Sequence, residues 1–346
     1  MKLQDRLGEL LFVGFMEQEM NASLAAHIRD LRPTGLIFFS RNIAAPEQLT
    51  RLTLDIQTLA MQELGRPLLL AVDQEGGSVA RMGPPFTQIP DAAVLGSRGL
   101  ESVSHYYNQI ASEMFQVGLN LNLAPVLDVN TVTSAGVMEA RSFGNDPSLV
   151  SQCGIEAITA TQGENIMATA KHFPGLGRAQ KDPHHDLPVI SASREKLDRH
   201  DLPPFQAAIQ ANVACVMTSH TLYPALDPEN PGTFSSVILR SLLRDELGFQ
   251  GVIISDDLEM EAAIEQYSQA DAGVAALRAG VDLLLVCNDL DKMNLTAEAV
   301  HEDFHRGLLD PQSLARSLTR VEKLRRTYLE PLNLPDPAAV AAHFSN

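Results

Sequence analysis

The segment KHFPGLGRAQKDPHHDLP, from Lys171 to Pro188, concentrates side chains that can transfer protons or bind polar ligands. It contains three histidines and two aspartates, together with several cations. The segment directly follows the apolar run 166–170, and a strand that leads into a loop rich in titratable groups is a common layout for a catalytic loop. Within it, Asp182 stands two residues before His184, so its carboxylate can orient the imidazole and raise its basicity. The pair therefore suits proton transfer.

The same segment allows other interpretations. His185 and Asp186 form a rival pairing, and the histidines could also serve only as polar loop residues. Histidine and aspartate at this density can ligate zinc, but this segment contains neither HExxH nor a similarly diagnostic spacing. A Walker loop and a dinucleotide fingerprint are also missing from the sequence. We therefore expect no metal and no other cofactor.

A second candidate is Asp256, the first of two carboxylates that follow an apolar run in GVIISDDLEM. Consecutive side chains of a strand point to opposite sides, so only one of Asp256 and Asp257 can face the mouth of a barrel. A carboxylate buried at such a place is costly unless it is used or paired. We assign Asp256 to the site and Asp257 to the N-terminal cap of the helix that follows.

These candidates require a scaffold, and the sequence predicts one. Eight short apolar runs alternate with segments of helical periodicity, which is the pattern of βα units and a parallel sheet. Polar residues, such as Asp73, Asp128, His220 and Asp256, follow most of the runs, as at the carboxyl ends of strands in barrel enzymes. We predict a (β/α)8 TIM-type barrel, in which the first strand could be irregular. The runs are Leu10–Phe15, Gly35–Phe39, Leu68–Val72, Leu119–Pro125, Ile166–Ala170, Val213–Met217, Gly251–Ile254 and Val281–Val286.

The length of 346 residues fits one large α/β barrel, and no Ser/Gly-rich linker or block of charge divides the chain. We therefore predict a single domain, residues 1–346. Asp310-Pro311 opens a last helix that we expect to close the barrel with an apolar face formed by Leu314, Leu318, Val321 and Leu324. The tail from about residue 330 is rich in Pro and Ala, and we expect it to be peripheral.

Composition limits the partners and the compartment. A net charge of −17 argues against nucleic acid and anionic membranes, because phosphate binding needs clustered Lys and Arg. The three cysteines, Cys153, Cys215 and Cys287, lie far apart without a CxxC pair, which suits reduced core thiols. Asp5 and Glu9 interrupt the N-terminal stretch where a signal peptide would need apolar residues. We therefore expect a cytoplasmic protein.

Several motifs together resemble glycoside hydrolase family 3. They are KHFPG-x-G followed by D-x-H-x-x-LP, with DQEGG-x-V-x-R, LAPVLDVN, RSFG-x-DP, SHTLYPALD, TFSS and SDDLEM. The resemblance extends over roughly residues 5 to 330 and is nearest to the family's single-domain β-N-acetylhexosaminidases of the peptidoglycan-recycling type. It implies a (β/α)8 barrel and a retaining mechanism.

The resemblance also implies roles for individual residues. Asp256 corresponds to the nucleophile that forms a glycosyl-enzyme, and His184, oriented by Asp182, corresponds to the acid/base. Two further residues, Asp128 and His220, are weaker candidates for the site. The sugar-binding positions, of which Arg81 and Lys171 could instead serve in structural ion pairs, fall on Asp73, Arg81, Arg141, Lys171 and His172.

The activity implied is release of terminal β-linked GlcNAc from peptidoglycan fragments, so the expected partner is a small carbohydrate. A β-glucosidase, a β-xylosidase, a glycoside phosphorylase of the same family and a non-catalytic sugar-binding relative remain open as alternatives. Three residues, Ser78, Leu176 and Pro183, depart from the family motifs. Leu176 replaces a histidine, which puts a hydrogen-bond anchor of the loop in question. Pro183 fixes φ inside the proposed dyad, which could alter its geometry.

Overall fold

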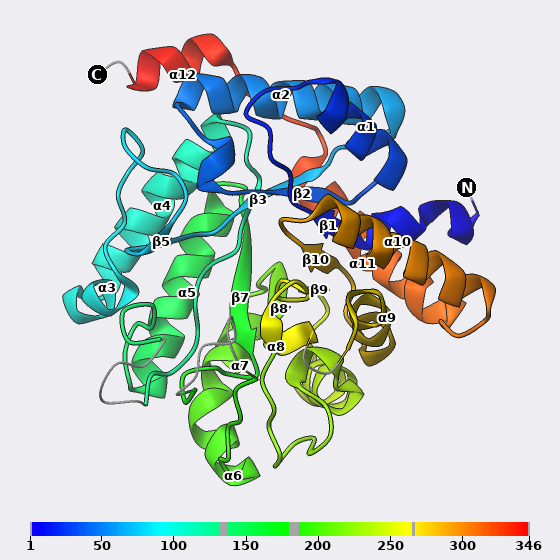
Figure 1. The fold of residues 1–346 in the computed structure, drawn as a ribbon. Helices are drawn as coiled ribbons and strands as arrows, with labels where there is room; N and C mark the ends of the chain where they lie inside the picture. The colour runs from blue at the N-terminus through cyan, green and yellow to red at the C-terminus, as the bar shows by residue number, and fades with distance from the viewer. Residues whose placement is uncertain (1, 132–137, 180–186, 265–266, 345–346) are drawn as a thin grey trace.

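The computed structural model describes residues 2–131, 138–179, 187–264 and 267–344 (Figure 1). Eight parallel strands form one sheet in the order β10-β1-β2-β3-β6-β7-β8-β9. A parallel bridge between Ile254, in β9, and Leu283, just before β10, joins the two outer strands of that order. The sheet is a nearly closed barrel, so the predicted (β/α)8 architecture is confirmed. The strands are β1 Leu11–Val13, β2 Gly35–Phe38, β3 Leu69–Val72, β6 Leu121–Asn122, β7 Met167–Phe173, β8 Cys215–Thr218, β9 Val252–Ile254 and β10 Leu284–Val286.

Every predicted apolar run contains or overlaps one of these strands, with differences at the ends. The first strand is regular, because β1 pairs in parallel with β10 on one side and β2 on the other. β7 continues through Phe173, so Lys171 and His172 lie on the strand itself and not on the loop after it. Their positions are therefore fixed by the barrel.

Helices cover the outside of the barrel (Figure 1). Several begin at side chains that accept a backbone N–H of the first turn, as caps do, including Asn21, Asp146, Ser268 and Asp289. The α-helices are α1 Ala22–Leu31, α2 Pro46–Glu63, α3 Ala92–Arg98, α4 Leu100–Gln116, α5 Pro147–Gly163, α6 Arg194–Lys196, α7 Pro203–Gln210, α8 Glu261–Ile264, α9 Gln269–Ala279, α10 Leu290–His305, α11 Pro311–Leu329 and α12 Pro337–Phe344. The 3-10 and π segments are η1 Leu3–Leu10, η2 Ser40–Asn42, η3 Leu197–Asp201, η4 Gly232–Phe234 and η5 Val237–Glu246.

The C-terminal part of the chain packs against the barrel. α11 follows its cap Asp310, and its predicted apolar face is buried. α12 lies on α2, where Val340 is buried and the Phe344 ring meets the Phe86 ring at 4.9 Å between centroids (Figure 1). The chain after residue 330 thus belongs to the outer helical layer.

Two apolar layers hold these elements together. One fills the barrel interior with strand side chains such as Phe12, Leu121, Met167 and Ile254, and the other lies between the sheet and the helices. All three cysteines are buried free thiols, as predicted. Among the described residues, no helix combines the length and the apolar character needed to cross a bilayer.

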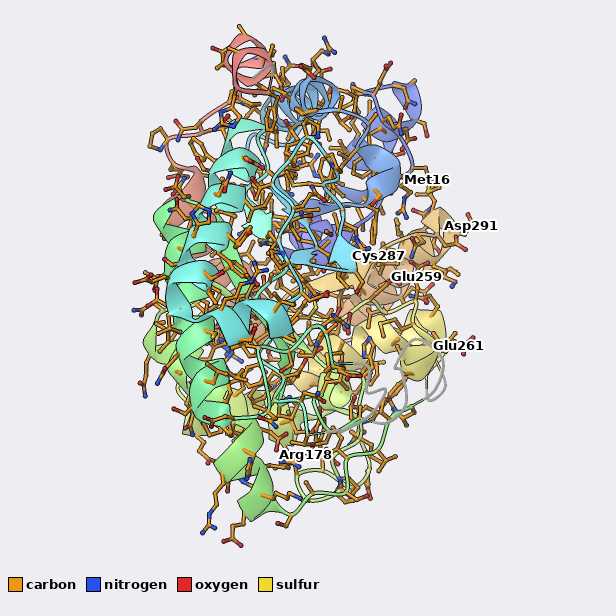
Figure 2. The ribbon with its side chains drawn as sticks, turned by 90° about the vertical axis from the view of Figure 1, so that its left-hand side faces the viewer. Met16, Arg178, Glu259, Glu261, Cys287 and Asp291 are labelled. Atoms are coloured by element: carbon orange, nitrogen blue, oxygen red, sulfur yellow. The ribbon has the colours of Figure 1, made fainter. Side chains whose placement is uncertain are left out.

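The carboxyl ends of the strands form the mouth of the barrel. Figure 2 shows Met16, Glu261 and Asp291 along one edge of the molecule, while Cys287 lies further inside. These four residues follow β1, β9 and β10 in the chain. The mouth is therefore the face on which loop and strand-end residues converge.

Candidate active site

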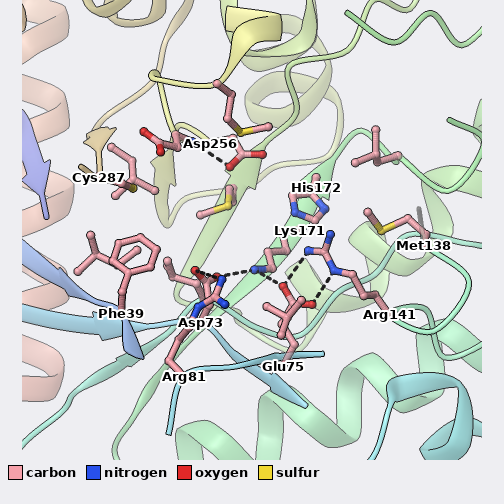
Figure 3. A pocket seen from close by; sticks show the side chains of 18 residues that line it. Phe39, Asp73, Glu75, Arg81, Met138, Arg141, Lys171, His172, Asp256 and Cys287 are labelled. Carbon is pink, nitrogen blue, oxygen red and sulfur yellow. Dashed lines mark hydrogen bonds and ion pairs between the residues drawn. The ribbon is translucent and has the colours of Figure 1, made fainter. Parts of the chain in front are cut away.

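A cavity of about 150 Å³ opens at this mouth. Six of the eight residues predicted for the site line it, namely Asp73, Arg81, Arg141, Lys171, His172 and Asp256 (Figure 3). The apolar part of the wall includes Phe39, Leu123, Met138, Leu176, Met217, Met260 and Leu285. One pocket therefore combines fixed polar groups with an apolar surface, as small-molecule sites do.

The two residues predicted for proton transfer, Asp182 and His184, lie outside the described residues. The same holds for Pro183 and for the rival pair His185 and Asp186. Their roles, and the zinc alternative for this loop, stay predictions.

A chain of alternating charges forms one side of the pocket. Lys171 Nζ lies 2.8 Å from Asp73 Oδ1 and 2.6 Å from Glu75 Oε1. Arg141 donates two hydrogen bonds of 2.8 Å to the two oxygens of Glu75. Arg81 Nη2 lies 3.9 Å from Asp73 Oδ2. Donors and acceptors are thus held in fixed positions, which suits bidentate recognition of sugar hydroxyls.

Glu75 was not singled out from the sequence, although it is central to this chain of charges. Burial alone would raise its pKa, but the charges of Lys171 and Arg141 outweigh burial and hold the pKa at about 2. Burial in turn lowers the pKa of Lys171, and Asp73 and Glu75 together raise it above its ordinary value. Glu75 and Lys171 are therefore both ionised near neutral pH. A signal was available, because Glu75 follows Asp73 by two residues in DQEGG and strand periodicity places both on one side.

A hairpin that was not predicted carries these carboxylates. β4 (Gln74–Gly76) pairs antiparallel with β5 (Val79–Ala80), and the Gln74 side chain accepts the backbone N–H groups of Arg81 and Met82. The turn requires glycine at Gly77, where φ is +55° and an added Cβ would lie 1.6 Å from Asp91 Oδ1. Ser78, one of the departures from the family motifs, is exposed in this turn.

Asp128 has a larger part than the sequence suggested. Its side chain is 0% exposed and does not line the pocket, but its Oδ2 lies 2.7 Å from Nδ1 of His172. Its Oδ1 accepts the backbone N–H groups of His172 and Leu176. Asp128 therefore holds both the imidazole and the backbone that follows β7.

These contacts show how the segment is anchored at Leu176, which replaces the histidine of the family motif. Its side chain is 3% exposed and packs with Val126, Met138 and Ala179, while its backbone N–H donates to Asp128. The segment is thus anchored through the backbone at this position, and no side-chain hydrogen bond is needed there.

Asp256 lies across the pocket from the chain of charges (Figure 3). Burial would raise its pKa, yet His172 and His220 outweigh burial and hold the pKa below its ordinary value. Its backbone N–H donates to Thr218 Oγ1, which ties it to the end of β8. The carboxylate is therefore ionised near neutral pH, as a nucleophile must be.

His220 lies behind Asp256. Its side chain is buried, its ring stacks on Phe234 at 5.8 Å between centroids, and its Nε2 lies 3.0 Å from the carbonyl oxygen of Asp257. Burial lowers the pKa of His220. It thus contacts the backbone that follows β9 and does not line the pocket.

The expectation that Asp257 caps the next helix was wrong in one respect. Its Oδ1 does accept the backbone N–H of Glu259, but α8 begins two residues further on, at Glu261. Asp257 also lines the pocket. Burial, with a contribution from the carboxylate of Glu259, raises its pKa to about 7.

Comparison with known proteins decides the family. Residues 2–324 match the model described as the glycosyl hydrolase family 3 N terminal domain. The chain belongs to glycoside hydrolase family 3. It is similar to the β-hexosaminidase of Nitrosomonas eutropha, with 37% identity over 277 residues, which are 78% of each chain.

Two solved structures place this family 3 chain more closely. It is similar to a family 3 β-N-acetylglucosaminidase from Paenibacillus sp. str. FPU-7, at 35% identity and a TM-score of 0.91 over 95% of this chain and 63% of the other. It is also similar to NagZ from Neisseria gonorrhoeae in complex with N-trifluoroacetyl-D-glucosamine, at 30% identity and a TM-score of 0.81 over 97% and 93%. The predictions of the family, of a glycoside hydrolase and of a likeness to β-N-acetylhexosaminidases are confirmed.

Proposed function

We propose that the protein is a retaining exo-β-N-acetylglucosaminidase that releases terminal β-linked GlcNAc from peptidoglycan fragments. The observation that carries the proposal is Asp256, an ionised carboxylate that faces a pocket lined by fixed hydrogen-bonding groups. A retaining enzyme needs such a carboxylate to attack the anomeric carbon and form a glycosyl-enzyme.

The relatives support the choice of sugar. The Nitrosomonas relative is named a β-hexosaminidase, the Paenibacillus relative a β-N-acetylglucosaminidase, and the Neisseria relative binds an N-acylated glucosamine. In this chain, Asp73, Arg81, Arg141, Lys171 and His172 are proposed to bind the hydroxyls of the terminal sugar. A pocket of about 150 Å³ holds one sugar end more readily than an internal stretch of a polymer, which supports exo action.

Retention also requires a proton donor near the leaving oxygen. We assign this role to His184, oriented by Asp182, on the basis of the motif D-x-H. His184 protonates the leaving group in the first step, and in the second step it removes a proton from the water that attacks the glycosyl-enzyme. One group can serve both steps when its pKa lies near the working pH.

A panel of nitrophenyl glycosides, assayed with and without phosphate, tests the substrate. We expect turnover of the GlcNAc compound without phosphate. No turnover of that compound would contradict the proposal. Preference for the glucose or xylose compound would favour a β-glucosidase or β-xylosidase. Dependence on phosphate would favour a phosphorylase.

Two variants test the chemistry. Asp256→Asn should abolish turnover and still bind GlcNAc, because the side chain keeps its shape and loses its charge. A non-catalytic sugar-binding protein would behave the same with and without this substitution. His184→Ala should affect a poor leaving group far more than an activated one, since the activated group leaves without protonation.

A further inference from the structure

We infer that Asp128 is a positioning residue that dictates which nitrogen of His172 carries the proton and which nitrogen faces the sugar. The inference deepens the proposed function, because His172 belongs to the proposed sugar site. Neither the family resemblance nor the fold by itself assigns this task to Asp128.

The two carboxylate oxygens of Asp128 have separate partners. Oδ1 accepts the backbone N–H of His172 at 3.3 Å and that of Leu176 at 2.5 Å. Oδ2 lies 2.7 Å from Nδ1 of His172. An ionised carboxylate can only accept hydrogen bonds, so Nδ1 must carry a proton. In the neutral ring, Nε2 is then an acceptor, and in the charged ring it is a donor.

The second ring nitrogen, Nε2, lies on the pocket side of the ring. His172 lines the pocket and Asp128 does not, so the Nδ1 edge of the ring is turned away from the ligand space and the Nε2 edge faces it. Figure 3 shows the His172 ring near Arg141 in this pocket. Asp128 therefore sets the hydrogen-bonding character of a pocket group without touching the pocket itself.

The chemistry requires a carboxylate at this position. An asparagine would present one oxygen and one NH2 group. If the oxygen keeps the two backbone N–H partners, the NH2 group meets Nδ1, which must then accept, and the ring proton moves to Nε2. The opposite rotamer would direct NH2 at two backbone donors inside a 0% exposed site, where unpaired polar groups are costly. Asp128→Asn should therefore reverse the tautomer of His172.

The tautomer can be read directly by long-range proton–nitrogen correlation spectroscopy on protein labelled with ¹⁵N-histidine. His172→Gln identifies the resonance by its loss. We expect neutral His172 to be protonated on Nδ1 in the wild type and on Nε2 in Asp128→Asn. If Asp128→Asn does not fold, the wild-type spectrum alone still decides, because a neutral ring protonated on Nε2 would overturn the inference.

Kinetics provide the second readout. Asp128→Asn should lower kcat/KM for the GlcNAc substrate by about 10- to 100-fold, the range found for residues that orient a histidine in a metal site. Because Asp128 acts through His172, the double variant Asp128→Asn/His172→Gln should be no worse than His172→Gln alone. Independent losses that multiply in the double variant would overturn the inference.

Asp282 offers a matched control. It is also 0% exposed and binds Ser317 Oγ and Arg244, but it does not line the pocket. Asp282→Asn should lower the Tm and leave both kcat/KM and the His172 tautomer unchanged. The spectrum needs no substrate, so inactivity toward GlcNAc compounds would overturn the proposed function alone. Retained Nδ1 protonation in folded Asp128→Asn would overturn this inference alone.

Discussion

Glu75→Gln is expected to loosen the whole charged side of the pocket. Glu75 is 4% exposed, accepts hydrogen bonds from Arg141 and forms an ion pair with Lys171. After the substitution, Lys171 keeps Asp73 as a partner, while Arg141 faces an amide whose NH2 group repels its donors. We therefore expect lower stability and a higher KM for the GlcNAc substrate.

The magnitude follows from the acidity of Glu75. Its pKa is about 2, against an ordinary 4.5. At about 1.4 kcal/mol per pKa unit this difference amounts to roughly 3 kcal/mol, similar to the 3–5 kcal/mol typical when one partner of a buried ion pair is removed. Because the folded-state pKa is the lower one, the stabilisation is fully present above about pH 4.5 and is lost as the pH falls toward 2. At about 2 cal/mol/K per residue, the Tm should fall by roughly 4 °C.

Urea unfolding between pH 5 and pH 8, together with KM measurements, checks this expectation. Glu113→Gln is the matched control, because Glu113 is 5% exposed, does not line the pocket and accepts hydrogen bonds from two neutral groups, the backbone N–H and the hydroxyl of Thr87. The control should cost about 1 kcal/mol and leave KM unchanged. The expectation is contradicted if Glu75→Gln lowers the free energy of unfolding by no more than Glu113→Gln does, or if the loss caused by Glu75→Gln grows between pH 5 and pH 8.

Two further outcomes are expected. Asp257 has a folded-state pKa of about 7 against an ordinary 3.8, so its ionisation opposes folding as the pH rises from 3.8 toward 7. The stability of Asp257→Asn relative to the wild type should therefore increase from pH 4 to pH 7 and stay constant above pH 7. Equal differences in the free energy of urea unfolding at pH 5 and pH 8 would contradict this. Leu176→His restores the family histidine inside an apolar cluster and should lower the free energy of unfolding by about 1–3 kcal/mol. It should not raise kcat/KM, because the backbone N–H already anchors the segment. A gain in activity would show that a side-chain anchor is missing.

The barrel could be predicted because its signal is local. Each strand is a short apolar run, and polar residues such as Asp256 follow directly, so periodicity and strand ends indicate both the element and its active end. The β4–β5 hairpin could not be predicted in this way. Its strands have three and two residues, and contacts between the Gln74 side chain and the backbone seven and eight residues further on hold it together.

Residue type and position in the sequence were enough to select residues that line the pocket, but not to predict which residues pair with one another. Glu75 pairs with Arg141, which is 66 residues away in the sequence, and Asp128 pairs with His172, which is 44 residues away. Neither pairing follows from a local pattern, because each depends on which loops and strand ends the fold brings together at the mouth of the barrel. Lys171 and His172, predicted as sugar-binding residues at a strand end, line the pocket, and β7 extends through both of them.

The acidity of Asp256 depends on histidines more than on the nearby lysine. Lys171 forms ion pairs with Asp73 and Glu75 at 2.8 and 2.6 Å, and these two carboxylates offset most of the effect of its positive charge on Asp256. After burial, which raises the pKa of Asp256, His172 and then His220 are the largest influences that lower it. His220 is itself buried, and burial lowers its pKa, so it favours the neutral form. Nδ1 of His172 in turn lies 2.7 Å from the buried carboxylate of Asp128. The ionisation of the proposed nucleophile is thus linked, through one imidazole, to a carboxylate outside the pocket.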